Sequence, residues 1–361
     1  DRAPRFETLY RILAWAGLAV GLVPLLSRPV LRLAADAFDQ LSIGVLAGSF
    51  TGVLILFIIP ISLLGTASPF AIRLLVDNTQ TAGSESGRIY AISTIGSFFG
   101  TFLPVLVLTP LVGTYRTFLV FAGLLVLTAL AGLAKTAGWK QALAHSWMAV
   151  VLLLLAIFGT PGTDKSSTGM NYEKESAYNY IQVLQFGDTR ILRLNEGQGI
   201  HSQYHPTELF YNGPWEQVLV APFFNPAPID PAEIKSLAIL GLAAGTTARQ
   251  AAAVYPGIRV DGFEIDSEIV KVGRDYFEMN DPNLIVLVQD GRWGLAHSPN
   301  RYQIISVDAY RPPYIPAHMV TREFFQIVHD HLTPDGVMVI NVGRAPSDRR
   351  LVDAMYQTIL T

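Results

Sequence analysis

The sequence predicts a multi-pass α-helical membrane domain followed by an α/β domain with a parallel sheet. Residues 1–160 consist of long apolar stretches, whereas residues 161–361 have the mixed composition of a globular domain. The chain is 50% hydrophobic and only 15% charged, whereas about a quarter of the residues of a soluble domain are charged. We expect a transmembrane domain over 1–160, a linker over 161–169, a small β-rich subdomain over 170–235 and a Rossmann-like domain over 236–361.

Composition excludes several classes of function. The net charge of −3 and the lack of a basic run give no argument for nucleic acid as a partner. The chain has no cysteine, which excludes disulfides, thiolate metal sites and a cysteine nucleophile. Its seven histidines are scattered, so no metal site is expected. The chain starts at Asp1 without a signal pattern and stops at Thr361 inside an expected helix, so we expect the natural protein to be longer.

Five stretches of the first half are apolar and long enough to cross a bilayer, which takes about 20 residues of helix. They are residues 8–26, 43–64, 90–112, 117–135 and 142–160. Glycines recur at every fourth position within them, a spacing that lets helix backbones approach closely. These glycines are Gly44, Gly48 and Gly52, and then Gly96 and Gly100. No acidic residue lies deep in the clearest spans, so transport is not indicated.

The second half alternates strand and helix patterns. Tyr180–Leu184 and Thr189–Asn195 predict a hairpin with a turn at Gly187. From Ser236 onward, the alternation is typical of a parallel sheet with crossover helices. The expected strands are Leu237–Gly241, Arg259–Glu264, Leu284–Val288, Ile304–Asp308 and Val337–Val342, and the expected helices are Thr246–Tyr255, Ser267–Met279, Thr321–His331 and a last one from Pro346.

Candidate binding residues follow the predicted strands at their carboxyl ends, where open α/β sheets bind ligands. Gly241 and Gly245 bracket a turn that lets the backbone pass close to a ligand at a helix N-terminus. Glu264 ends the next strand about 20 residues later, where an acid accepts ribose hydroxyls. Asp290 and Asp308 end the two strands after that. Each acid alone could be a solvated loop residue, but three on successive strand ends favour a nucleotide site.

Short motifs in both halves carry a family resemblance. They are Leu64-Gly65-Thr66-Ala67-Ser68-Pro69, Gly87-Arg88-Ile89-Tyr90-Ala91, Gly96-Ser97-Phe98-Phe99-Gly100-Thr101, Asn195-Glu196-Gly197-Gln198-Gly199 with His201-Ser202, Gly213-Pro214-Trp215, Phe263-Glu264-Ile265-Asp266, Asp290-Gly291, Asp308-Ala309-Tyr310 and Pro313-Tyr314-Ile315-Pro316 with Thr321-Arg322-Glu323-Phe324. With these motifs the chain resembles spermidine synthases, and more closely the bacterial membrane proteins that fuse several helices to a spermidine-synthase-like domain.

The resemblance implies a seven-stranded methyltransferase-like sheet after a small β-domain, with its last hairpin beyond Thr361. It implies S-adenosylmethionine, decarboxylated S-adenosylmethionine or methylthioadenosine as the ligand. Glu264 would bind the ribose and Asp290 the adenine, and Asp308 matches the acid that accepts the proton of the attacking amine. The substrate side would include His201, Tyr310 and Arg311.

The departures from the spermidine synthase pattern concern charge. Ala244 stands where the family has the aspartate that helps to hold the propylamine chain, and Arg311 stands where it has a second acid. His201 replaces the substrate-side glutamine of the family. Because a buried ammonium without a partner is costly, we expect that free putrescine is not the substrate. Arg311 would suit a phosphate or a carboxylate instead.

Two functions follow as hypotheses. The first is a membrane-anchored aminopropyl- or methyltransferase that uses an adenosyl cofactor, with Asp308 as general base and the lipid bilayer as partner. The second is a non-catalytic membrane subunit that keeps the fold and serves as an assembly module in a larger complex. Ala244 and Arg311 motivate the second hypothesis.

The expected location is a bacterial inner membrane, with the side of the α/β domain left open. If all five spans are real, most cationic residues lie on the side opposite to the α/β domain, and the positive-inside rule places that domain outside. An adenosyl cofactor is made in the cytoplasm, which favours the opposite orientation, and one miscounted span reverses the charge argument. The cationic residues are Arg2, Arg5, Arg11, Arg73, Arg88, Lys135 and Lys140 on one side and Arg28, Arg32 and Arg116 on the other.

Overall fold

The structure is a computed structural model, and the chain divides into two compact units, Asp1–Lys165 and Ser166–Thr361. This division falls in the linker predicted over 161–169. The side chains of residues 28 and 31–49 lie outside the description. The described residues are 4–41, 45–76, 80–159, 167–195, 199–310, 315–343 and 348–360.

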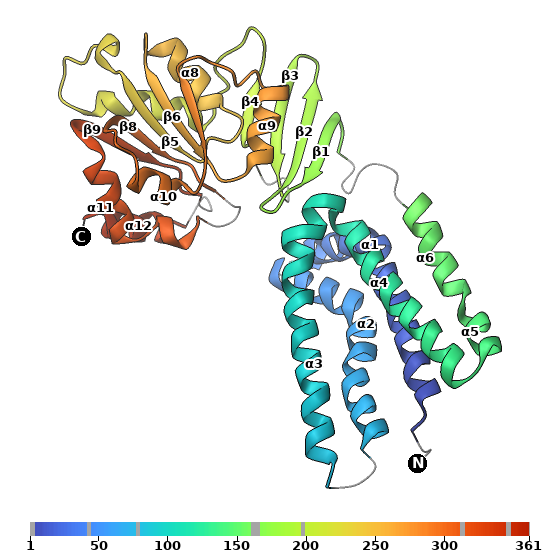
Figure 1. The fold of residues 1–361 in the computed structure, drawn as a ribbon. Helices are drawn as coiled ribbons and strands as arrows, with labels where there is room; N and C mark the ends of the chain where they lie inside the picture. The colour runs from blue at the N-terminus through green and yellow to red at the C-terminus, as the bar shows by residue number, and fades with distance from the viewer. Residues whose placement is uncertain are drawn as a thin grey trace. The chain divides into compact units, whose positions relative to one another are not determined.

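The first unit is helical throughout its described residues (Figure 1). Four stretches in it are long and apolar enough to cross a membrane: Phe6–Ser27, Phe50–Leu75, Ala82–Thr136 and Trp139–Phe158. Its elements are α1 (Phe6–Leu41), α2 (Val45–Leu75), α3 (Ala82–Leu103), a π-helical turn η1 (Pro104–Leu108), α4 (Thr109–Thr136), α5 (Trp139–His145) and α6 (Trp147–Phe158).

The stretch Ala82–Thr136 bends sharply at Gly113, where φ is 81° and ψ is 163°. A straight helix of its 55 residues would be roughly 80 Å long, whereas a bilayer core is about 30 Å thick. Figure 1 shows α3 and most of α4 as separate arms joined at one end. The expected spans 90–112 and 117–135 therefore lie on either side of this one bend.

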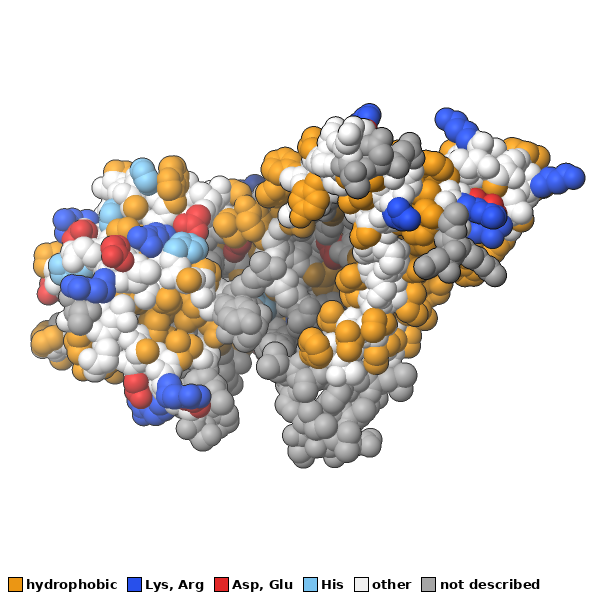
Figure 2. Space-filling model, turned by 90° about the horizontal axis from the view of Figure 1, so that it is seen from below, with side chains coloured by type: hydrophobic (Ala, Val, Ile, Leu, Met, Phe, Trp, Pro, Cys, Tyr) orange, Lys and Arg blue, Asp and Glu red, His pale blue; other side chains and the backbone are white. Residues whose placement is uncertain are grey.

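The N-terminus and the α2–α3 and α4–α5 connections lie at one end of the helical unit, and α6 ends at the other (Figure 1). Basic residues occupy the helix ends at these connections. Arg73 lies in the last turn of α2 and Lys135 in the last turn of α4, and Lys140 begins α5. Figure 2 views this end and shows Lys and Arg side chains around a surface that is otherwise largely hydrophobic. These three residues lie on the side that the sequence predicts for them, whereas the side chains of Arg28 and Arg32, predicted on the other side, lie outside the description.

Helices α1 and α4 form the core of the helical unit together with α6. Ala14 and Leu18 of α1 pack with Ala122 and Val126 of α4, and Met148 of α6 completes the cluster. A Cβ atom added to Gly17 would lie 2.8 Å from Val126 Cγ2 and 3.0 Å from the carbonyl oxygen of Ala122. Small residues therefore let these two helices approach closely, as is common in membranes.

Of the glycines that the sequence singled out, Gly52 of α2 is buried, whereas those of α3 do not make such a contact. A Cβ atom on Gly96 or Gly100 of α3 would have no described atom within 4 Å, and α3 has no buried residue. Gly44 and Gly48 lie outside the residues whose side chains are described. Close packing through small residues is found at Gly17 and Gly21 of α1. A Cβ atom added to Gly21 would clash with the side chains of Leu152 and Ala122.

The second unit begins with a four-stranded antiparallel sheet in the order β1-β2-β3-β4. The predicted hairpin is confirmed: β2 and β3 pair from Ile181–Leu194 to Phe186–Thr189, and Gly187 adopts a φ of 59° in the turn. The strands are β1 (Met170–Glu175), β2 (Tyr180–Phe186), β3 (Thr189–Leu194) and β4 (Ser202–Tyr204).

A parallel sheet follows, in the order β7-β6-β5-β8-β9. All five predicted strands are present, and the described residues contain these five of the seven that the resemblance implies. The strands are β5 (Ser236–Leu240), β6 (Arg259–Glu264), β7 (Leu284–Val288), β8 (Tyr302–Val307) and β9 (Leu332–Ile340). The helices are α7 (Pro214–Val220), α8 (Thr246–Val254), α9 (Ser267–Tyr276), α10 (Gly291–Ala296), α11 (Arg322–Asp330) and α12 (Arg350–Leu360), with short 3₁₀ turns η2 (Ala221–Phe224), η3 (Pro231–Glu233) and η4 (Ala317–Met319).

Helices cover both faces of the parallel sheet (Figure 1). Leu237 and Ile239 of β5 face a core shared with α7, α8 and α9, whereas Ala238 and Leu240 face a core shared with α10, α11 and α12. Because α7 belongs to the first core through Val218 and Leu219, the expected boundary of the small subdomain at residue 235 is too late. The antiparallel sheet ends at Tyr204.

Asp266 joins the small sheet to the parallel one. It caps α9 by accepting a hydrogen bond from Glu268 N at 3.0 Å. Its other oxygen accepts hydrogen bonds from Ser176 Oγ at 2.5 Å and Asn179 Nδ2 at 3.0 Å, both in the β1–β2 turn. A buried carboxylate thus fixes the small sheet beside α9, whose residues Ile269 and Val272 share its core.

The α1–α4 contact predicts different effects for two glycine substitutions. Gly17→Ala adds a methyl group against the Ala122 backbone and should destabilise the protein by about 1–3 kcal/mol, as overpacking does. Gly123→Ala on α4, where no described atom lies within 4 Å, should be neutral or stabilise by up to about 1 kcal/mol because alanine favours helix. Thermal unfolding of the detergent-solubilised chain, followed by circular dichroism, measures both. Equal effects would show that α1 and α4 do not pack in this way.

Candidate functional site

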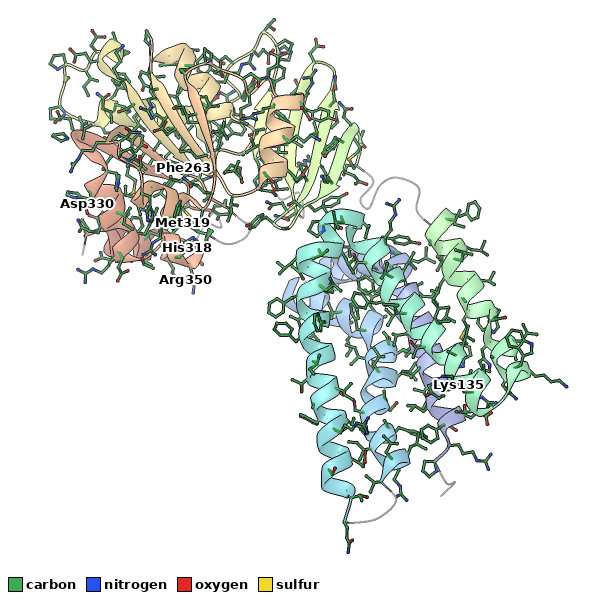
Figure 3. The ribbon with its side chains drawn as sticks, viewed as in Figure 1. Lys135, Phe263, His318, Met319, Asp330 and Arg350 are labelled. Atoms are coloured by element: carbon green, nitrogen blue, oxygen red, sulfur yellow. The ribbon has the colours of Figure 1, made fainter. Side chains whose placement is uncertain are left out.

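A cavity of about 200 Å³ lies at the carboxyl ends of the parallel strands. Glu264 at the end of β6, Asp290 after β7 and Asp308 after β8 all line it, so the three predicted acids come together. Figure 3 labels Phe263, His318 and Met319 of its wall. The cavity is concave and mostly apolar with a few convergent polar groups, which is typical of ligand sites.

Glu264 is held by backbone donors. Its Oε2 accepts a hydrogen bond from Ala243 N at 2.9 Å and its Oε1 accepts one from Asp266 N at 3.1 Å. Only 7% of the residue is exposed, and burial raises its pKa to about 7, although the backbone donors lower it. The carboxylate is therefore fixed in place, and it becomes mostly ionised only above neutral pH.

Asp290 combines a structural role with its place in the cavity. Its Oδ1 caps α10 by accepting a hydrogen bond from Trp293 N at 2.9 Å. Its Oδ2 lies 2.9 Å from Nε2 of His318, which also lines the cavity. Both oxygens thus have protein partners, and contact with an adenine amino group remains a prediction.

The side chain of Asp308 has a single hydrogen bond among those between described residues, in which Asn341 Nδ2 donates to its Oδ1 at 2.9 Å. The side chain is partly exposed, but protein surrounds the carboxyl group and burial raises its pKa to about 6. The hydrogen bond from Asn341 lowers the pKa of Asp308 and so opposes the effect of burial. A carboxylate that is ionised just below neutral pH and has a free oxygen is suited to accept a proton.

Gly241 determines how close β5 lies to Asp308. Its φ is +93°, and an added Cβ atom would lie 2.5 Å from the carbonyl oxygen of Asp308 and 2.7 Å from Ala309 N. Gly241 also lines the cavity, as predicted. Gly245, by contrast, does not line it; its φ is +86°, and an added Cβ atom would meet Met279 at 2.7 Å. Packing at the start of α8 explains this second glycine.

The structure describes two of the three predicted substrate-side residues, His201 and Tyr310. His201 lines the cavity, its Nδ1 is buried without a hydrogen-bond partner among the described residues, and burial lowers its pKa. Tyr310 also lines it, and its hydroxyl accepts a hydrogen bond from Gly343 N at 3.0 Å. Arg311 lies outside the described residues.

Sequence reasoning missed several members of this site. Asn179, in the β1–β2 turn, lines the cavity, as does His318 beside Asp290. No spacing marks these loop residues in advance. Asn341, however, follows β9 directly, so the strand-end rule that found the three acids also applies to it. Within the described ranges, no group of three His, Asp or Glu side chains could hold a metal ion.

Comparison with known proteins identifies relatives of this unit. Residues 229–359 match the family model of the spermine/spermidine synthase domain. A probable polyamine aminopropyl transferase of Bifidobacterium longum is 39% identical over 176 residues, 49% of this chain and 38% of that protein. A polyamine aminopropyltransferase of Vibrio vulnificus is 28% identical over 207 residues, 53% of this chain and 66% of that protein. The chain therefore spans less than two thirds of the length of either relative.

Solved structures show the same similarity. A probable spermidine synthase of Corynebacterium glutamicum is 23% identical with a TM-score of 0.46, covering 54% of this chain and 71% of that one. The spermidine synthase of Thermotoga maritima is 22% identical with a TM-score of 0.43, covering 53% of this chain and 63% of that one.

Because Gly241 lies against the Asp308 backbone, replacing it should cost more stability than replacing another glycine that has only a positive φ. Gly241→Ala should destabilise the protein by on the order of 2–4 kcal/mol, because backbone strain adds to a clash with the Asp308 backbone. Gly257→Ala, at a φ of +71° with only Lys235 Nζ at 3.9 Å, should cost about 1 kcal/mol. Thermal unfolding of the full chain measures the difference. Equal costs would rule out the close approach of β5 to Asp308.

Proposed function

We propose that the chain, whose residues 229–359 match the family model of the spermine/spermidine synthase domain, is a membrane-anchored transferase that moves an aminopropyl group from decarboxylated S-adenosylmethionine to an amine. The observation that supports this most is the convergence of Glu264, Asp290 and Asp308 on one cavity. The donor carries a sulfonium and an ammonium, and carboxylates stabilise such cations in a site that excludes water.

The residues of the cavity fit such a donor. Gly241 lines the cavity without a side chain, and its close approach to the Asp308 backbone brings Asp308 to the same cavity. Glu264, held by Ala243 N and Asp266 N, would accept hydrogen bonds from the ribose hydroxyls. Asp290 and His318 would face the adenine. The donor would supply an electrophilic carbon bonded to its sulfonium.

Asp308 would act as general base in the transfer. The acceptor nitrogen attacks the propylamine carbon, the carbon–sulfur bond breaks, and the electron pair moves to sulfur, which leaves neutral methylthioadenosine. The attacking nitrogen loses one proton, and Asp308 accepts it through the oxygen that Asn341 does not occupy. Because burial raises the pKa of Asp308 to about 6, the base is ionised at neutral pH.

We also propose that the acceptor amine is not free putrescine. Ala244 is 3% exposed and its N–H bonds to Ser202 Oγ at 2.9 Å, so it adds no charge to the cavity. Of the three carboxylates in the described lining, Glu264 and Asp290 already have partners on both oxygens. A second ammonium on the acceptor would therefore compete for carboxylates that the protein already uses.

The proposed membrane anchoring is supported by the helices, which are long and apolar enough to span a bilayer. The proposed location is a bacterial inner membrane. Transfer requires the α/β unit to face the cytoplasm, because the donor is made there. The cationic helix ends opposite to the end of α6 favour the reverse orientation by the positive-inside rule. Orientation is thus the condition on which the activity depends.

Substitution of the base tests the activity. Asp308→Asn should reduce release of methylthioadenosine from decarboxylated S-adenosylmethionine, assayed with a panel of amines, by about 10²–10⁴-fold while nucleoside binding persists. In the wild type, the rate should rise with pH through about 6, as the Asp308 carboxyl loses its proton. Asp281→Asn, outside the cavity lining, is the matched control. Undiminished turnover in Asp308→Asn would remove the general base from the mechanism, and no turnover in the wild type would favour a non-catalytic module.

Orientation can be tested directly because the chain contains no cysteine. Lys271→Cys on α9 and Lys140→Cys on α5 each place one thiol at an exposed position. If the α/β unit faces the cytoplasm and the helices cross five times, a membrane-impermeant maleimide should label Cys at 140 in intact cells and Cys at 271 only after permeabilisation. The reverse pattern would place the α/β unit outside, and it would overturn a transfer that depends on a cytoplasmic donor.

A further inference from the structure

The cavity that Glu264, Asp290 and Asp308 line is called the nucleoside cavity below. Asn341 contacts Asp308 from outside it. Strands β8 and β9 are in register up to Val307 and Ile340, and Asn341 N continues the ladder by donating to Val307 O at 3.0 Å. This register places the amide of Asn341 beside Asp308, where Nδ2 donates to Oδ1 at 2.9 Å. Asp308 therefore meets its partner directly at the end of the adjacent strand.

Asp308 lies between two hollows. It lines the nucleoside cavity, which Asn341 does not line, and it lines together with Asn341 a second hollow of about 390 Å³ bounded by α7, β9 and α12. The amide thus approaches Oδ1 from the side of the second hollow. The remaining oxygen is left for the nucleoside cavity, where a proton would be accepted.

A second bond joins the same two segments. Gly343 N donates to the hydroxyl of Tyr310 at 3.0 Å. A Cβ atom on Gly343 would lie 2.1 Å from that hydroxyl oxygen, so a larger residue would displace the Tyr310 side chain from this position. The end of β9 therefore holds both Asp308 and Tyr310, and both of these residues line the nucleoside cavity.

We propose that Asn341 is a positioning residue for Asp308, whose amide fixes one carboxylate oxygen so that the other is aimed at the proton of the acceptor amine. This inference rests on the proposed transfer, because it gives Asp308 a proton to accept. A merely structural bond between strand ends would stabilise the fold without affecting the protonation of Asp308.

The electrostatic consequence distinguishes these two roles. A hydrogen bond donated to the ionised form of an acid lowers its pKa, and Asn341 lowers the pKa of Asp308 against the effect of burial. Loss of the amide should therefore raise that pKa. The other titratable groups of the nucleoside cavity are Tyr178, His201, Glu264, Asp290, Tyr310 and His318. Tyr356 of α12 lines the second hollow.

The experiment uses the full chain in detergent and two readouts. The first is the pH profile of kcat/KM for methylthioadenosine release. The second is an infrared titration in which the band absent from Asp308→Asn identifies the Asp308 carboxyl group. Asn341→Ala should move the acidic limb of the profile and the infrared midpoint upward by about half to one pH unit. At pH 6 the rate should fall several-fold, with a smaller loss at pH 8.

Two further variants serve as comparisons. Asn341→Asp keeps the shape of the side chain but replaces the donor with a carboxylate, so it should move both midpoints further upward. Asn300→Ala removes a similar bond, from Nδ2 to Asp261 Oδ2 at 3.0 Å, away from the cavity. It should affect stability and leave both midpoints in place.

The outcomes separate the inference from the function on which it rests. Unchanged midpoints in a folded Asn341→Ala protein would overturn the positioning role, even if the wild type is an active transferase. An infrared shift without turnover in the wild type would support the contact between Asn341 and Asp308 but overturn the proposed transfer.

Discussion

The close approach of Gly241 to the backbone of Asp308 is the contact on which the site depends. Parallel strands bring their carboxyl ends to one edge of a sheet, but the loops that follow could still diverge. Here β5 and β8 are neighbours, Asp308 N donates to Leu240 O at 2.8 Å, and no atom larger than hydrogen fits on Gly241. The loop after β8 therefore has to pass over the end of β5, which brings Asp308 into the same cavity as Glu264.

The same edge explains how much of the site the sequence could predict. Predicted strands that are followed by an acid placed Glu264, Asp290 and Asp308 correctly at strand ends, because parallel strands bring their carboxyl ends to one edge of the sheet. Asn341 was missed although it follows the same rule, because an amide carries no charge to draw attention to it. His318 was missed because it lies in the short 3₁₀ turn η4, whose path depends on tertiary contacts that no local pattern records.

The fold was predicted well where periodicity is strong and less well elsewhere. The hairpin from Tyr180 and the five parallel strands were recognised, but the short α10 and β4 were not, since six and three residues carry little pattern. In the helical unit, apolar stretches showed where helices lie but not which faces meet. Glycine spacing pointed to the region of α2 and to α3, and the glycines of α3 are open, whereas close packing occurs at Gly17, opposite the backbone of α4. Spacing records that a close approach is possible, and only the partner helix decides where it happens.

Because burial raises the pKa values of Glu264 and Asp308, the net charge of the cavity changes with pH near neutrality. With pKa values of about 7 and 6, these two groups hold a fraction of their protons near neutrality. A cationic guest would favour the ionised forms and expel those protons into solution. Binding of such a cation would release protons from the cavity. The affinity of the cavity for a cation would therefore depend on the pH of the compartment that it faces.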